Sequence, residues 1–169
     1  MPAPLRDCKP AEIPIDVATV SRLTASFEHV RSRTDDLGVA FFRRLFDESP
    51  AIRILFPADT ESQQRALIET LTMVVDHLNQ PAAILPSLRV LGERYAGYGT
   101  TNAHYAVACK VLVDSIGEIT TEVNAPWSLS LALEWKTALD LVAEIMINGA
   151  GPPRETVKVA EGRANTAST

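Results

Sequence analysis

Apolar residues recur at spacings of three and four through most of this chain, which is the spacing of one face of an α-helix. In the first such segment Leu23, Phe27 and Val30 share a face, and Asp16 is placed to cap a helix that ends near Arg31. No useful length of sequence alternates between apolar and polar residues as a half-buried strand does. The pattern therefore predicts an all-α domain with about seven helices.

Capping residues and prolines set the limits of the other expected helices. Ser49 and Pro50 suit the cap and first turn of a short helix, which should end near Phe56 because a residue before proline disfavours the α conformation. Pro81 and Pro86 are expected to bracket an irregular stretch. The expected ranges are 34–46, 50–56, 61–78, 87–98, 102–120 and 126–148, with Gly99 and Gly149 as helix stops and Thr101 or Asn102 as a cap.

The two ends of the chain differ from its body. Residues 1–15 form a proline-rich leader that cannot be one continuous helix, because each proline lacks an N–H donor. Residues 149–169 are small, polar and charged without a hydrophobic face, so we expect a disordered tail. Residues 16–148 are then expected to form a single domain.

Composition narrows the function classes. The 169 residues are 46% hydrophobic, enough for one core, and the formal net charge of -5 leaves no broad cationic field for nucleic acid. Two cysteines are too few for a disulfide framework, and Cys109 is expected to be a small core residue. Without a membrane-length apolar run or a secretory signal pattern, we expect a cytoplasmic protein that does not engage a membrane.

Four segments of the body carry a family resemblance. They read GVAFFRRLFDESPAIRILFPAD (38–59), ILPSLRVLGERYAGYG (84–99), NAHYAVACKVLVDSI (102–116) and PWSLSLALEW (126–135). In this order and spacing they resemble single-domain bacterial haemoglobins and the haemoglobin part of flavohaemoglobins, over about residues 23–147. The resemblance implies a globin fold that binds haem b (protohaem IX). The residues after the globin body are too few for a reductase domain, so any flavin reductase is expected to be a separate protein.

The resemblance implies which residues would lie on the distal side of the haem. Phe56 matches the phenylalanine that wedges against the haem face, and Leu67 matches the apolar residue that closes the pocket. Gln63 matches the distal polar residue, with the neighbouring Gln64 as an alternative. Phe42 stands where the family often has a tyrosine whose hydroxyl stabilises bound oxygen. A phenyl ring donates no hydrogen bond, so oxygen should bind about one to two decades more weakly unless Gln63 compensates.

A second departure from the family concerns the proximal iron ligand. The family motif LG-x-R-H reads Leu91-Gly92-Glu93-Arg94-Tyr95 here, so the resemblance implies Tyr95 as the metal ligand in place of histidine. A phenol ligates iron well only as phenolate, which favours ferric over ferrous iron, as in the tyrosine-ligated haem of catalases. Free tyrosine has a pKa of about 10, so ligation near neutral pH requires a metal or another cation to stabilise the anion.

Other residues around the implied haem have open roles. Arg94 could meet a haem propionate or solvent, whereas Leu91 and Tyr98 would pack against the haem or its edge. Tyr105 matches a tyrosine that bonds the proximal histidine in some family members, and here it could hydrogen-bond a phenolate. The acidic partner in that network falls near Ala150, so this part of the network is expected to be missing.

The three histidines are the candidates for supplying an imidazole in place of Tyr95. His104 lies nine residues after Tyr95, at the start of the next helix, and is the alternative iron ligand. His29 is expected on the surface. His77 lies fourteen residues beyond Gln63, about four helical turns away, so it cannot reach the same iron unless the helix breaks.

Three functions follow from these residues. The leading hypothesis is a haem-binding globin with mainly ferric iron, suited to haem sensing or carriage or to peroxide or nitric-oxide chemistry, so both enzymatic and non-enzymatic roles stay open. The second is a haem-free globin fold that binds an apolar ligand or a partner protein. The third is a conventional oxygen-binding haemoglobin, which requires His104 or a rearranged helix. Expected partners are haem, small gaseous or anionic iron ligands and, in some schemes, a separate reductase; the chain is expected to be a monomer or homodimer.

Overall fold

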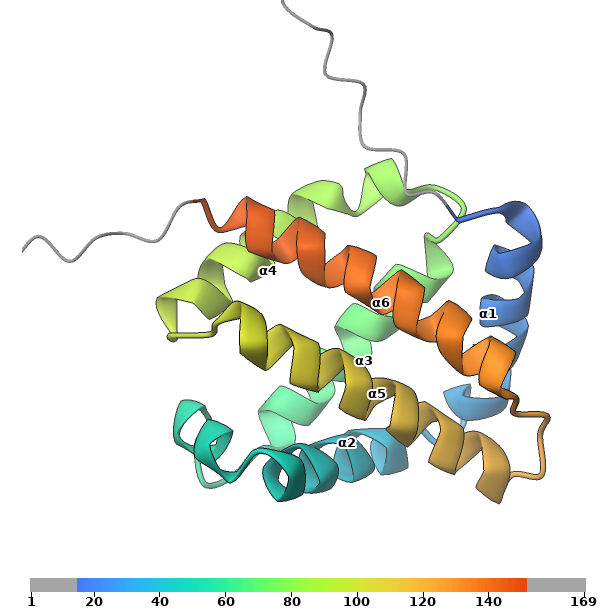
Figure 1. Ribbon diagram of the computed structural model, residues 1–169, viewed down its shortest axis with the longest axis horizontal. Coiled ribbons are helices and arrows are strands. Elements are labelled where there is room, and N and C mark those ends of the chain that lie inside the picture. Colours follow the sequence, from blue (N-terminus) through green and yellow to red (C-terminus); the bar gives the residue numbers. More distant parts are fainter. Residues whose placement is uncertain (1–14, 152–169) are drawn as a thin grey trace, which may run out of the picture.

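The computed structural model describes residues 15–151, and nearly all of them lie in helices (Figure 1). Within this range the all-α prediction of about seven helices is confirmed, with six α-helices and two short 3-10 helices. The predicted leader and tail lie almost entirely outside the described residues. The elements are α1 (Val17–Arg31), α2 (Thr34–Glu48), η1 (Pro50–Leu55), α3 (Glu61–Asp76), η2 (Pro81–Ala83), α4 (Leu85–Gly97), α5 (Asn102–Glu122) and α6 (Leu129–Gly149).

Helices α5 and α6 run antiparallel across the front of the molecule and organise the rest of the fold (Figure 1). Helix α4 packs mainly on α6, while α2 packs mainly on α5 and α3. A single hydrophobic core joins all six α-helices. Its largest fully buried side chain is Trp135, which is 1% exposed and whose Nε1 donates to the Oγ of Ser26 at 3.2 Å. The buried indole N–H therefore keeps a hydrogen-bond partner, as burial of a tryptophan requires.

Side-chain caps fix the starts of three helices. The carboxylate of Asp16 accepts from the backbone N–H of Thr19 at 3.0 Å, which confirms the predicted cap of α1. Thr101 caps α5, as predicted, by accepting from the backbone N–H of His104. The prediction that the last helix begins near Pro126 is wrong, because Ser128 caps it and its first residue is Leu129.

Other predicted boundaries also need correction. Pro86 lies in the first turn of α4, where its missing N–H leaves no helical bond unmade, so the helix begins at Leu85 rather than after the proline. Gly149 was predicted to stop the last helix but is its final residue. A Cβ there would lie 2.7 Å from the Cα of Arg89, so this glycine allows α6 to approach α4 closely. Gly99, in contrast, has a φ of +89° just after α4 ends, as suits a helix stop.

Ion pairs connect α2 to α5 at the surface of the protein. Glu118 of α5 pairs with both Arg43 and Arg44 of α2. The Nζ of Lys110 lies 2.8 Å from the Oε2 of Glu48 at the far end of α2. These pairs are partly exposed, so solvent screening limits their contribution to stability. Among residues 15–151, no helix combines the length and apolar character needed to cross a membrane.

Candidate functional site

A cavity of about 500 Å³ lies inside the helical body, and its lining is mostly apolar. Residues from α2, η1, α3, α4, α5 and α6 all contribute to its wall. The sequence placed ten residues around a ligand, and the structure brings all ten to this one cavity. They are Phe42, Phe56, Gln63, Leu67, Leu91, Arg94, Tyr95, Tyr98, His104 and Tyr105.

Aromatic rings form one wall of the cavity. Phe42, from the densely apolar α2, is 5% exposed, and its ring meets that of Phe56 edge-on with centroids 5.3 Å apart. Phe46 completes the cluster, with its centroid 5.7 Å from Phe42 and 5.8 Å from Phe56. Edge-to-face contacts of this kind hold the rings in defined orientations. Phe42 presents no hydroxyl to the cavity, so this aromatic wall donates no hydrogen bond to an occupant.

The structure separates the two adjacent glutamines of α3. Gln63 lines the cavity, and its side-chain oxygen accepts from the Oγ of Ser62 at 3.0 Å. Gln64 instead packs against Gly38 of α2, and its Nε2 donates to the Oγ1 of Thr60 at 3.1 Å. Gln63 is therefore the amide available to a ligand in the cavity, and Gln64 belongs to the contact between α2 and α3.

Tyr95 belongs to α4, and its side chain forms part of the cavity wall. Burial raises the pKa of its phenol above the ordinary value of 10, and the nearby charge of Arg94 only partly opposes this. The hydroxyl is therefore protonated at neutral pH unless a cation is close to it. The ring of Tyr98 lies 6.4 Å from that of Tyr95 by centroid, but Tyr98 is 62% exposed and sits at the rim.

Tyr105 of α5 presents the cavity with a buried polar atom that lacks a partner. Its hydroxyl oxygen is fully shielded from solvent and makes no hydrogen bond within the described residues. Burial, with a smaller contribution from the neighbouring Tyr95, raises the pKa of this phenol to about 12. An unpartnered buried hydroxyl in a native fold calls for an explanation such as an absent ligand. One turn further along α5, the thiol of Cys109 donates to the carbonyl of Leu139 at 3.6 Å.

His104 lines the cavity but its imidazole is already engaged. Its Nδ1 accepts from the backbone N–H of Thr101 at 3.1 Å as part of the capping box of α5. A neutral imidazole that accepts at Nδ1 carries its proton on Nε2, which then has no lone pair for a metal. His29 is exposed, and the Nδ1 of His77 lies 2.9 Å from the carbonyl of Met73. Neither of these two histidines lines the cavity.

Two further predicted positions complete the proximal side. Arg94 is exposed while it contributes to the cavity lining, so it lies at the rim with its charge open to solvent. Ala150 follows the last residue of α6 and carries only a methyl group. No carboxylate therefore stands at this position to pair with Tyr95 or Tyr105.

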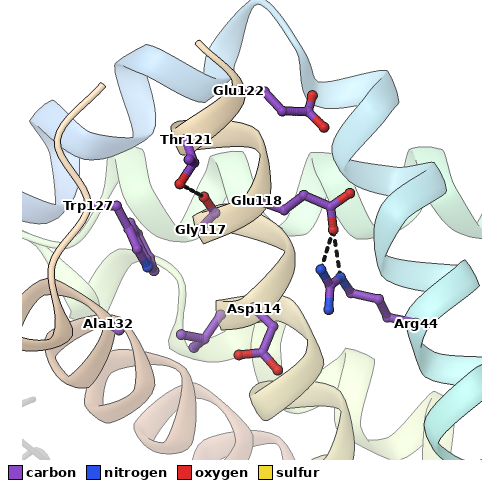
Figure 2. Close-up of a pocket in the computed structure, with 9 residues that line it drawn as sticks. Arg44, Asp114, Gly117, Glu118, Thr121, Glu122, Trp127 and Ala132 are labelled. Carbon is purple, nitrogen blue, oxygen red and sulfur yellow. Dashed lines mark hydrogen bonds and ion pairs between the residues drawn. The ribbon is translucent and has the colours of Figure 1, made fainter. Parts of the chain in front are cut away.

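A second hollow, of about 520 Å³, lies on the outside of α5 and contains none of the predicted site residues. Figure 2 shows its walls, with the Arg44–Glu118 ion pair on one side and Trp127 on the other. A Cβ on Gly117 would lie 2.7 Å from the indole of Trp127, so the ring rests directly on the helix backbone. This surface groove is open and acidic, in contrast to the apolar interior cavity.

Sequence reasoning missed two residues that shape the cavity. Arg53 of η1 donates to the carbonyls of Pro57 and Ala58, in the segment that continues the cavity wall. Gly92 lies at the crossing of α4 with α6, against the main chain of Met146. Gly92 belongs to the same motif that identified Tyr95, so this motif could also have pointed to Gly92. The pairing of Arg53 with backbone carbonyls carries no comparable sequence signal.

The order of helices around this cavity is that of a globin. The family model described as Globin matches residues 39–146, which is more than half of the chain, and the chain belongs to this family.

Curated relatives of the globin body are named flavohemoproteins. The one from Rhodopirellula baltica is 22% identical over 125 residues, covering 72% of this chain and 30% of the relative. The one from Chromobacterium violaceum is 27% identical over 110 residues, covering 63% of this chain and 26% of the relative. The chain therefore spans only about 26–30% of the length of these relatives.

Solved structures share the fold at low sequence identity. An engineered carbene transferase, derived from a putative nitric oxide dioxygenase of Rhodothermus marinus, has a TM-score of 0.71 at 22% identity. The likeness covers 80% of this chain and 93% of that one. A bacterial globin from Campylobacter jejuni has a TM-score of 0.69 at 14% identity and covers 80% and 96% of the two chains. At these identities the likeness establishes the fold.

Proposed function

We propose that this protein binds haem b in the interior cavity and holds the iron mainly in the ferric state through the phenolate of Tyr95. The observation that carries the proposal is the position of Tyr95 in the cavity wall. The imidazole of His104, the alternative ligand, is already engaged in the cap of α5. The names of the curated relatives, flavohemoproteins, support haem as the ligand.

The cavity fits a flat apolar macrocycle with charged edges. Its volume of about 500 Å³ falls within the range of about 300–1,000 Å³ for small-molecule sites. The aromatic wall of Phe42 and Phe56 offers flat packing surface, and Arg94 offers a positive charge at the rim. The unpartnered hydroxyl of Tyr105 is the polar atom that a bound group would explain.

Tyr95 and Tyr105 would have different roles on the proximal side of the haem. Haem, when bound, supplies an iron whose positive charge stabilises an anionic oxygen ligand and whose remaining position takes a gas or a small anion. Tyr95 would hold the iron as a phenolate, with its proton released to solvent, and the cation would offset the burial that otherwise raises its pKa. Tyr105, with a pKa of about 12, keeps its proton and can donate to the new phenolate. This would give the orphaned hydroxyl its partner.

The distal side would hold bound oxygen poorly. Phe42 has no donor, and among the predicted distal residues that line the cavity only Gln63 can donate a hydrogen bond. A hydrogen bond to a polarised oxygen contributes about 1.5–3 kcal/mol, so its absence at Phe42 removes a large part of oxygen stabilisation. Together with an anionic proximal ligand, this favours haem sensing or carriage, or peroxide or nitric-oxide chemistry, over reversible oxygen storage. A reductase on a separate protein would be needed only for reactions that cycle the iron.

The test is the absorption spectrum of purified protein with and without added haemin, ferric and after dithionite reduction. We expect a ferric phenolate-type spectrum that collapses, or haem that is lost, on reduction. The Tyr95→His variant should gain a ferrous spectrum that responds to oxygen, and Tyr95→Phe should lose the phenolate features while still taking up haemin. An unchanged spectrum in Tyr95→Phe would show that another residue ligates the iron.

The same experiment distinguishes haem binding from the second candidate function. An apolar cavity without a free imidazole also suits that second function. Protein that stays colourless with added haemin would indicate a haem-free globin that binds an apolar ligand. The content of the cavity would then be identified by extraction and mass spectrometry. A ferrous oxygen-binding spectrum that depends on His104 would instead indicate a conventional haemoglobin.

A further inference from the structure

The segment between η1 and α3 forms part of the cavity wall without belonging to a helix. Phe56 and Pro57 both line the cavity, and α3 begins only at Glu61. Backbone bonds tie the segment at its ends, from the N–H of Phe56 to Arg53 and from the N–H of Gln64 to Thr60. The carbonyls of residues 56–58 accept no backbone hydrogen bond among the described residues. Another group must therefore hold the middle of this wall.

The guanidinium of Arg53 donates hydrogen bonds to these three carbonyls. Its Nη1 donates to the carbonyl of Pro57 at 2.6 Å and, more weakly, to that of Phe56 at 3.3 Å. Its Nη2 donates to the carbonyl of Ala58 at 2.9 Å. The guanidinium carbon also lies 4.7 Å from the ring centroid of Phe46, in the aromatic cluster behind the wall. One cation thus links three successive carbonyls to Phe46, whose ring packs against Phe42 and Phe56 of the cavity wall.

We infer that Arg53 is a positioning residue that holds the 56–58 wall closed and thereby sets how fast an occupant leaves the cavity. The planar fork of arginine can serve several carbonyls at once while its face rests on an aromatic ring. Lysine has one compact ammonium and cannot reproduce both contacts. The choice of haem as occupant rests on the proposed function, whereas the closure of the wall does not.

The experiment compares wild type, Arg53→Lys, Arg53→Met and a control, Arg65→Met. Methionine keeps most of the apolar stem of Arg53 but removes every donor. Among residues 15–151, Arg65 pairs only with Glu61 on the exposed side of α3, and it does not line the cavity, so its loss controls for a missing surface arginine. Circular dichroism and thermal melts first establish that each variant is folded.

The first measurement is hydrogen exchange of the haem-free protein, which needs no ligand. We expect the amides of Phe56 and of residues 58–61 to exchange at least about fivefold faster in both Arg53 variants, because the wall opens locally. Amides of α5 and α6 should keep wild-type rates, and Arg65→Met should match wild type throughout. Unchanged exchange at residues 56–61 in Arg53→Met would overturn the inference.

The second measurement is the dissociation rate of haemin into an excess of a haem-scavenging protein. We expect about a tenfold increase for Arg53→Met and a smaller one for Arg53→Lys, because charge-assisted hydrogen bonds to the wall are lost. The ligation spectrum should stay that of wild type, since Tyr95 lies on another helix. Faster exchange with an unchanged release rate would overturn the link to release. If wild type takes up no haemin, the proposed function fails, and release of anilinonaphthalene sulfonate from the cavity replaces this measurement.

Discussion

Gly92 of α4 lies directly against the main chain of Met146 in α6: a Cβ on Gly92 would be 1.9 Å from the carbonyl oxygen of Met146. The two helices therefore touch backbone to backbone at this point. Tyr95 follows Gly92 by three residues, which is just under one helical turn. The position of the phenol in the cavity thus depends on a contact that only glycine permits.

Gly92→Ala should therefore destabilise the protein by about 3 kcal/mol or more, at or above the upper end of overpacking penalties, because backbone cannot move aside as a side chain does. Gly97→Ala is the matched control on the same helix, since no atom lies within 4 Å of its added Cβ. That variant should be neutral or gain up to about 1 kcal/mol from helix propensity. Urea unfolding of haem-free protein measures both values. Equal midpoints for the two variants would show that α4 and α6 separate without cost.

The fold was predictable because periodic apolar residues and local capping signals specify helices independently of tertiary contacts, whereas the residues of the site came from the resemblance to bacterial haemoglobins. Asp16 and Thr101 acted as caps, and the ten site residues lie around one cavity. The start of α6 was mispredicted because Pro126 suited a first turn, whereas Ser128, two residues later, caps the helix. Two good local signals competed there, and sequence alone offered no means of choosing between them.

Long-range contacts account for what the sequence did not reveal. Gly149 reads as a helix stop, yet its role is to admit Arg89 of α4, which is sixty residues away in the chain. Nothing in the sequence marks Arg53, since the carbonyls that it meets are free only where residues 56–60 form no helix. Both roles arise from packing in three dimensions, which apolar periodicity does not encode.

Phe42→Tyr should restore a donor to the distal wall. Phe42 lines the cavity, whereas Phe46, four residues later in the same aromatic cluster, does not, so Phe46→Tyr is the matched control. In haemin-loaded protein we expect Phe42→Tyr to slow the loss of azide or another small anion by about tenfold, as a hydrogen bond to a charged acceptor would. Stopped-flow displacement measures this rate. Equal rates in Phe42→Tyr and wild type would place the bound anion away from Phe42.

Tyr105→Phe should have opposite effects on the haem-free and the haem-bound protein. The hydroxyl has no partner in the structure, so its removal should raise the free energy of unfolding by about 1 kcal/mol at pH 7. In the haem-bound protein the same change removes the proposed donor to Tyr95, and haemin affinity should fall by about tenfold. Tyr98→Phe, which alters an exposed tyrosine, should change neither value. A parallel loss of stability and affinity in Tyr105→Phe would show that its hydroxyl already has a partner without haem.

The pH dependence of Tyr105 gives an independent check on the same residue. Its pKa is about 12 in the folded protein against 10 for an unperturbed phenol, so the unfolded state loses this proton first as pH rises. Titration of this group leaves the free energy of unfolding unchanged below pH 10 and lowers it as pH rises from 10 to about 12. The alkaline fall in unfolding midpoint should therefore be shallower in Tyr105→Phe than in wild type. Identical alkaline slopes would contradict the burial of this hydroxyl.

Cys109 should be unreactive in the folded protein, and the Cys8→Ser variant leaves it as the single thiol of the chain. Burial raises the pKa of its thiol from 9.0 to about 11, which lowers the thiolate fraction at pH 8 roughly a hundredfold, and only thiolate attacks iodoacetamide. Labelling at pH 8 should therefore be at least about a hundredfold slower in native than in denatured protein, and the native rate should climb about tenfold per pH unit toward pH 11.

The unfolded state ionises first, so this thiol contributes stability below pH 9 that is lost as pH rises to about 11. Because Cys109 lines the cavity, bound haemin should slow its labelling further, and a labelling rate insensitive to haemin would place the ligand elsewhere.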